Sequence, residues 1–210
     1  MTRLLYVEAS PRKTRAASIE VGRAFLDAYH RANPSDEIET LDIWASDYPP
    51  FDGEVMVAKY AGLDGVALTS EQENAWQIIR QLAAPFLSAD KLLLAVPLWN
   101  FGIPYRLKHL IDLITHRDIL FAFDGTRFQG LMKARKATVI YARGLDFSAG
   151  GSTPASAFDF QKPYIEAWLR VIGVTSVHGV IVEKTVLGPE VDLAGRAAAK
   201  QEAAALAAVF

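Results

Sequence analysis

Five stretches of the chain carry the pattern expected of β-strands. Three of them, Arg3 to Glu8, Lys91 to Val96 and Lys136 to Ala142, have apolar residues on both faces. Short runs of this kind are typical of parallel strands that are buried between helices. Glu37 to Ile43 and Val177 to Val182 complete the set of predicted strands.

Between these strands, apolar residues recur every three or four positions, which predicts amphipathic helices. The clearest stripes lie within residues 19–29, 76–86, 103–114 and 164–172, and the alanine-rich tail from Pro189 to Phe210 is also helical in pattern. Alternating strands and helices with right-handed crossovers give an α/β fold, a three-layer α/β/α arrangement around a five-stranded parallel sheet. We expect residues 1–210 to form one such domain, because no linker or internal repeat interrupts them.

Several residues mark the ends of the predicted helices. Ser70 followed by Glu73 resembles a capping box, and Pro85 is expected to break or kink the end of that helix. Pro104 suits the first turn of the next helix. Gly173 is expected to end a later helix, because glycine readily adopts the left-handed cap conformation.

Two segments, residues 44–68 and 118–131, have no regular pattern. The second one carries three aromatic residues, Phe121, Phe123 and Phe128. Aromatic residues in such an excursion cover a pocket or a partner subunit, or they pack as part of an ordinary surface loop. The sequence leaves both interpretations open.

Composition narrows the functional classes. Hydrophobic residues make up 51% of the chain, charged residues 22%, and the formal net charge is −2, so neither disorder nor a broad nucleic-acid-binding surface is favoured. No apolar run approaches the ~20 residues that cross a bilayer, and the N-terminus lacks the features of a signal peptide. The chain has no cysteine, which excludes disulfides, thiolate nucleophiles and iron–sulfur clusters. We therefore expect a cytoplasmic protein that binds neither nucleic acid nor membranes.

Unusual loops follow three of the predicted strands, and ligands bind at the carboxyl ends of strands in parallel sheets. The loop from Ala9 to Ser18 supplies hydroxyls, cations and backbone N–H groups ahead of a helix, a composition that fits a phosphate. A solvated, capped loop explains the same residues. Pro97 to Pro104 contains Trp99, Asn100 and Phe101, which suit a flat heterocycle, although core packing of the aromatic rings is an equal alternative.

The third loop, Ala142 to Phe147, brings a cation and a flexible glycine to the next strand end. No G-x-G-x-x-G fingerprint, Walker loop or nucleophile elbow is present elsewhere. His109 and His116 are better explained by helix-surface or capping roles than by metal binding, and we expect no metal site.

At these three loops the sequence resembles the FMN-dependent NADH-azoreductase family, and the resemblance extends over essentially the whole chain. Ser10 and Ser18 match the ends of that family's phosphate loop, whose middle serine is replaced by Ala16. The segment from Pro97 to Phe101 resembles the family's Pro-Met-Tyr-Asn-Phe, with Trp in place of Tyr, and Ala142 to Leu145 resembles its Ser-Arg-Gly-Gly.

The resemblance implies a flavodoxin-like fold and an enzyme that binds FMN. It also implies a ping-pong reaction: NADH or NADPH reduces the bound flavin, and a quinone or azo compound then takes the same face and receives the electrons. The flavin carries the chemistry, so no catalytic side chain is expected. A flavodoxin-type electron carrier and a general NAD(P)H:FMN reductase are the alternatives.

Site residues follow from the same resemblance. The cofactor-binding residues would be Ser10, Arg12, Ala16, Ala17, Ser18, Pro97, Leu98, Trp99, Asn100, Phe101, Gly102, Ala142, Arg143, Gly144 and Leu145. The substrate-binding residues would be Phe101, Phe121, Phe123, Phe147 and Trp168. The family also implies a homodimer with active sites at the interface, in which the second subunit covers each flavin.

Overall fold

The computed structural model describes residues 1–53, 55–57 and 67–210. Its main sheet contains the strands β1 (Arg3–Glu8), β2 (Glu37–Asp42), β3 (Lys91–Pro97), β6 (Lys136–Ala142) and β7 (Ser176–Val182). All are parallel, in the order β2-β1-β3-β6-β7. The predicted five-stranded parallel sheet is confirmed. Because β1, β3 and β6 are neighbours, their carboxyl ends lie side by side.

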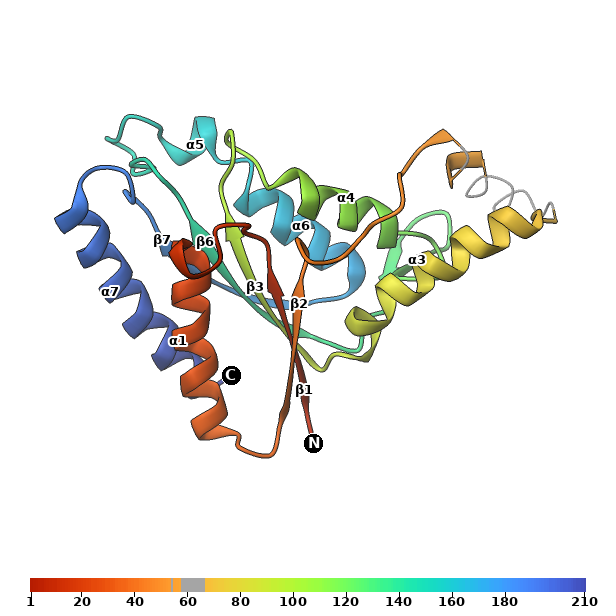
Figure 1. Cartoon of the computed structure of the whole chain (residues 1–210), viewed down its shortest axis with the longest axis horizontal. Coiled ribbons are helices and arrows are strands. Elements are labelled where there is room, and N and C mark those ends of the chain that lie inside the picture. Colours follow the sequence, from red (N-terminus) through yellow and green to blue (C-terminus); the bar gives the residue numbers. More distant parts are fainter. Residues whose placement is uncertain (54, 58–66) are drawn as a thin grey trace.

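Helices cover both faces of the sheet (Figure 1). On one face lie α1 (Ala17–Ala32) and α7 (Pro189–Ala207), and on the other α3 (Ser70–Ser88), α4 (Tyr105–Ile114) and α6 (Lys162–Ile172). The short helices η1 (Lys13–Arg15) and α5 (Ala155–Phe158) lie in connecting loops. In the described part of the chain, no helix combines the length and apolar character needed to span a membrane.

Alternate residues of β3 show why the central strands are apolar on both sides. Leu92, Leu94 and Val96 pack against the layer of α3, α4 and α6, whereas Leu93 and Ala95 pack against α1 and α7. All five are fully buried. This burial places the site-forming loops on a rigid support.

Helix ends follow the predicted signals with small differences. The capping box of α3 is formed by Thr69 and Gln72, not by Ser70 and Glu73, because the Thr69 hydroxyl accepts from the Gln72 backbone N–H at 3.3 Å. Pro85 lies inside α3, which continues to Ser88. The Ser88 hydroxyl donates to the Pro85 carbonyl at 3.1 Å and supports this last turn.

Two further helix signals concern α4 and α6. Pro104 is the N-cap residue of α4 and not part of its first turn. Gly173 caps α6 in the left-handed conformation, with φ of 108°, which confirms the predicted helix end.

A two-stranded antiparallel hairpin, β4 (Phe121–Phe123) and β5 (Phe128–Gly130), forms within the segment that has no regular sequence pattern. Its backbone is held close to the end of α6: a Cβ added at Gly130 would lie 2.1 Å from the Gly173 nitrogen. Residues 54 and 58–66 of the other irregular segment lie outside the described residues.

Candidate functional site

A cavity of about 180 Å³ lies where β1, β3 and β6 end. All three loops singled out in the sequence contribute to it. Its lining consists of Ser10, Arg12, Ala16, Ala17, Ser18, Pro97, Leu98, Trp99, Ala142, Arg143, Gly144, Thr185, Val186 and Arg196.

Four residues expected at the cofactor, Asn100, Phe101, Gly102 and Leu145, belong to the same loops but do not line this cavity. Thr185, Val186 and Arg196 line it without having been singled out in the sequence. Thr185 and Val186 reach it because the loop after β7 pairs with the loop after β6: the Val186 N–H donates to the Gly144 carbonyl at 3.1 Å.

The start of α1 presents open hydrogen-bond donors to the cavity. Ala16 is the N-cap and has no capping side chain, and the first intrahelical bond runs from the Glu20 N–H to the Ala16 carbonyl at 2.9 Å. The N–H groups of Ala17 and Ser18 therefore have no partner within the helix. Among the described residues, the buried Ser18 hydroxyl has no hydrogen-bond partner either. This end of α1 suits an anion.

The three cations of the first loop do not play equal parts. Arg12 lines the cavity with an exposed side chain, and its backbone N–H donates to the Ser10 hydroxyl at 3.3 Å. Lys13 forms an ion pair with Asp42 and adopts a left-handed φ of 50°. Arg15 is exposed and does not line the cavity.

The second loop contains a tight turn that places two residues in the left-handed region. Trp99 and Gly102 exchange backbone hydrogen bonds of 3.1 and 2.9 Å, and φ is 47° at Asn100 and 69° at Phe101. Asparagine tolerates this conformation, but it is uncommon for a bulky residue such as phenylalanine. Backbone strain of this kind is concentrated at ligand-binding sites.

An aromatic group links the first and second loops. The Trp99 ring lies 5.7 Å from the ring of Trp44, which in turn packs edge-on against Tyr105 at 5.5 Å. The Trp44 indole N–H donates to the Ala9 carbonyl at 3.1 Å. Trp99 is thereby held as a fixed wall of the cavity.

The guanidinium of Arg143 does not offer a free charge to the cavity, contrary to the simplest interpretation of the third loop. Only 3% of its side chain is exposed, and it forms an ion pair with the buried carboxylate of Asp159. It also lies 5.0 Å above the Phe147 ring. Arg143 is therefore a positioning residue of the loop.

Gln161 extends this buried network to the neighbouring strand. Its side-chain amide donates to the Val96 carbonyl at 2.8 Å, and its oxygen accepts from Arg143 at 3.4 Å. Gln161 is fully buried. It thus joins the ends of β3 and β6, from which the second and third loops leave.

Asp146 supports the third loop electrostatically. The Ser148 N–H, at 3.0 Å, and the Lys184 ammonium, also at 3.0 Å, lower the pKa of Asp146 to about 2. The ordinary pKa of this carboxyl is 3.8, so the stabilisation is present above that pH and is lost as pH falls through about 2. We expect Asp146→Asn to reduce the acid dependence of thermal unfolding between pH 4 and pH 2, relative to wild type. Identical slopes in both proteins would contradict this prediction.

The aromatic residues expected at the substrate are dispersed. Phe101 is 38% exposed beside the cavity, and Phe147 is buried beneath Arg143. Trp168 is buried in the core against Phe86, and its indole N–H donates to the Thr115 hydroxyl at 3.0 Å. Within one chain, Trp168 does not line the strand-end cavity.

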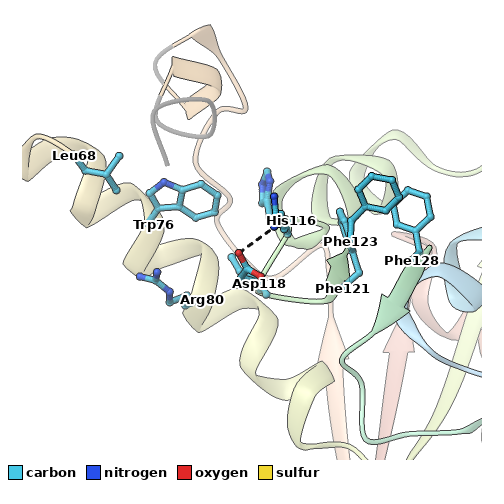
Figure 2. Close-up of a pocket in the computed structure, with 10 residues that line it drawn as sticks. Leu68, Trp76, Arg80, His116, Asp118, Phe121, Phe123 and Phe128 are labelled. Atoms are coloured by element: carbon cyan, nitrogen blue, oxygen red, sulfur yellow. Dashed lines mark ion pairs between the residues drawn. The ribbon is translucent and has the colours of Figure 1, made fainter. Parts of the chain in front are cut away.

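Phe121 and Phe123 lie in a second cavity of about 480 Å³, between the β4–β5 hairpin and α3 (Figure 2). There they face Trp76 and Arg80 across the cavity, with Phe128 beside them. The two cavities share no lining residue. Within one chain these phenylalanines are therefore separate from the strand-end site.

The chain is similar to known proteins along nearly its whole length. Residues 2–207 match a family described as having a flavodoxin-like fold. The chain is 55% identical, over the full length of both proteins, to FMN-dependent NADH:quinone oxidoreductase 9 of Burkholderia lata. It is 52% identical to FMN-dependent NADH:quinone oxidoreductase 3 of Pseudomonas fluorescens, over 99% of this chain and 96% of that protein.

Solved structures show the same relationship. The crystal structure of an azoreductase from Bacillus anthracis is 28% identical, covers 100% of both chains and gives a TM-score of 0.89. A structure of a Bacillus anthracis FMN-dependent NADH-azoreductase in complex with FMN is 25% identical over 99% of this chain and 100% of that one, with a TM-score of 0.82. The chain therefore belongs to the flavodoxin-like family that includes FMN-dependent NADH:quinone oxidoreductases and azoreductases.

Proposed function

We propose that this chain is an FMN-dependent oxidoreductase that takes electrons from NADH or NADPH and reduces quinones and azo compounds. The observation that carries the proposal is the buried Ser18 hydroxyl, which has no partner among the described residues and lines the strand-end cavity with the open N-terminus of α1. The full-length relative from Burkholderia lata, named as an FMN-dependent NADH:quinone oxidoreductase, supports the same assignment.

In this proposal the FMN phosphate binds at the start of α1. Ser10 and Ser18 provide hydroxyls, and Ala16 and Ala17 provide only backbone atoms. The positive end of the helix dipole and the unpaired N–H groups favour a phosphate dianion there. Ala16 in place of the family serine removes one hydroxyl from this cradle, so the remaining donors carry more of the binding.

The flavin ring would lie between the second and third loops, from Pro97 to Gly102 and from Ala142 to Leu145. Bound FMN supplies hydride transfer between the nicotinamide and the acceptor. The protein's part is to orient the ring against the Trp99 wall and to keep one ring face open to both substrates in turn. The tight turn at Asn100 and Phe101, closed by the backbone hydrogen bonds between Trp99 and Gly102, would help to set this orientation.

We also propose a homodimer in which each site is completed by the second subunit. Cavities that hold a whole ligand usually measure about 300–1,000 Å³, and the strand-end cavity measures only about 180 Å³. This small volume supports a site in which the flavin nucleotide extends beyond the cavity of one chain. The partly buried Phe121 and Phe123 are separate from this cavity in their own chain, which suits them to cover the site of the other. Of the residues expected at the substrate, Phe101 is exposed enough to contact a substrate beside this cavity, whereas Phe147 is buried beneath Arg143.

The direct test is purification followed by assay. The protein should be yellow with about one FMN per chain and should oxidise NADH in the presence of a quinone or an azo dye. Assays with NADH and NADPH against a quinone panel would define the electron donor and the acceptor. Because NADH and NADPH are intracellular, we expect the protein in the cytoplasm. A colourless protein that fails to bind added FMN would end the flavin proposal.

Replacing Ser18 by aspartate should weaken FMN binding at least tenfold, because a carboxylate would then oppose the phosphate at close range. Riboflavin, which lacks the phosphate, should bind with nearly unchanged affinity. Fluorescence titration of both flavins measures the difference. Equal FMN affinity in wild type and Ser18→Asp would place the phosphate elsewhere.

A further inference from the structure

Arg196 lines the strand-end cavity from α7, a helix that follows the site-forming loops in the chain and packs against α1. Its side chain is only 14% exposed. The guanidinium Nε donates to Asp192 at 2.7 Å and Nη1 donates to Glu20 at 2.7 Å. Two carboxylates therefore hold this guanidinium in one orientation beside the first turn of α1.

The surrounding charges are balanced. Glu20 also accepts a hydrogen bond of 2.7 Å from Lys200, and this bond, together with Arg196, keeps the pKa of Glu20 below its ordinary value. The group thus contains two cations, Arg196 and Lys200, and two anions, Glu20 and Asp192. Arginine has five N–H donors, and the contacts among the described residues leave its Nη2 without a partner.

The other cations of the cavity are less suited to bind a phosphate. The Arg143 guanidinium is already paired with Asp159, and the Arg12 side chain is exposed. Glu20, in the first turn of α1, would repel an anion bound at the helix start if its charge were not compensated. Arg196 alone among the three arginines of the cavity lining is both fixed in place and bonded to the helix that offers the anion site.

We propose that Arg196 is a phosphate-binding residue of the FMN site. Held by Glu20 and Asp192, its free guanidinium edge donates to the phosphate and supplements a cradle in which Ala16 and Ala17 provide no hydroxyl. The inference rests on the proposed placement of the phosphate at the start of α1. It makes Arg196 a determinant of the preference for FMN over riboflavin, because only FMN carries the group that the guanidinium recognises.

The test compares FMN and riboflavin binding to the full-length chain after removal of flavin. Arg196→Met should weaken FMN binding by roughly 10- to 100-fold, the range expected when a charge-assisted hydrogen bond is lost. Riboflavin affinity should change less than about twofold, since it makes no such bond. Titration by flavin fluorescence yields both constants, and thermal unfolding of each variant checks that it is folded.

Lys200→Met is the matched control. Lys200 bonds the same Glu20 carboxylate but does not line the cavity, so this variant removes one positive charge and one tie between α7 and α1 without removing a phosphate ligand. It should change FMN affinity less than about threefold, because a charge at longer range is screened by solvent. If Arg196→Met does not fold, Arg196→Lys takes its place, with a smaller loss that is again confined to FMN.

Two results would overturn the proposal: equal losses for FMN and riboflavin, or an FMN loss in Arg196→Met no larger than that in Lys200→Met. Ser18→Asp separates this failure from a failure of the proposed site. If Ser18→Asp weakens FMN binding but Arg196→Met does not, the phosphate lies at α1 and Arg196 is a structural tie. If neither variant affects FMN binding, the phosphate placement itself is wrong.

Discussion

Replacing Asp159 by alanine is expected to lower the free energy of unfolding by about 3–5 kcal/mol, the cost of leaving one partner of a buried ion pair uncompensated. The Arg143 and Asp159 side chains are only 3% and 7% exposed. Glu183 lies 4.0 Å from the guanidinium and is more exposed, so it is a poor substitute. The Asp159 carboxylate also accepts the backbone N–H groups of Gln161 and Lys162 at 3.0 and 2.9 Å, and these bonds at the start of α6 would be lost as well.

The double variant Arg143→Met/Asp159→Leu is the control for this prediction. Removing both charges leaves no unpaired ion, so the double variant should be more stable than Asp159→Ala. Chemical denaturation of the three proteins measures the differences. A loss of less than about 1 kcal/mol in Asp159→Ala would show that the pair is weaker than its burial indicates.

The same variants test whether the buried network positions the site. Gln161 connects Arg143 to the Val96 carbonyl, so the network ties together the strands from which two site loops leave. The double variant should therefore bind FMN more weakly than wild type even where its stability is restored. Unchanged FMN affinity in a stable double variant would limit the network to a role in folding.

The central sheet could be predicted because each buried strand is marked by its own short run of apolar residues. Burial on both faces forces apolar residues from Leu92 to Val96 in β3, and the same holds for most of β1 and β6. The β4–β5 hairpin was not predicted, since three-residue strands carry too little alternation and its place depends on the close contact between Gly130 and Gly173. The predicted capping residue of α3, Ser70, lies one residue after the observed one, Thr69. The sequence could not separate them because Thr69–Gln72 and Ser70–Glu73 both satisfy the capping pattern.

The position of the candidate site could be predicted because it follows from the order of the strands in the sheet. Ligand-binding loops lie at the carboxyl ends of neighbouring parallel strands, and the order β1-β3-β6 brings the three expected loops together. The partners of these loops come from distant segments. Asp159 lies 16 residues beyond Arg143, and Arg196 lies 176 residues beyond Glu20, in a helix whose alanine-rich sequence carries no functional signal. Only the packing of α7 on α1 reveals Arg196 at the cavity.

If the active site is shared between subunits, Phe121 and Phe123 of one subunit form a roof over the cofactor site of the other. Removing this roof should impair catalysis and leave flavin binding nearly intact. In Phe121→Ala/Phe123→Ala, the lost aromatic contacts are expected to raise KM for bulky azo substrates by about tenfold or more, or to weaken the dimer. FMN content should stay close to that of wild type, because neither phenylalanine lines the strand-end cavity. Sedimentation that shows a fully active monomer at assay concentration would contradict the shared site.

Subunit mixing tests the same idea more sharply. A Ser18→Asp chain has a damaged cofactor site but an intact roof, and a Phe121→Ala/Phe123→Ala chain has the reverse. In a hybrid dimer the intact cofactor site of one chain meets the intact roof of the other, so one of the two sites is complete. Random reassortment of an equimolar mixture makes half of the dimers hybrids. When FMN is limiting and the azo substrate is well below KM, each variant alone is strongly impaired, and the mixture should recover about a quarter of wild-type activity. If each site lay within one chain, the mixture would show only the average activity of the two variants.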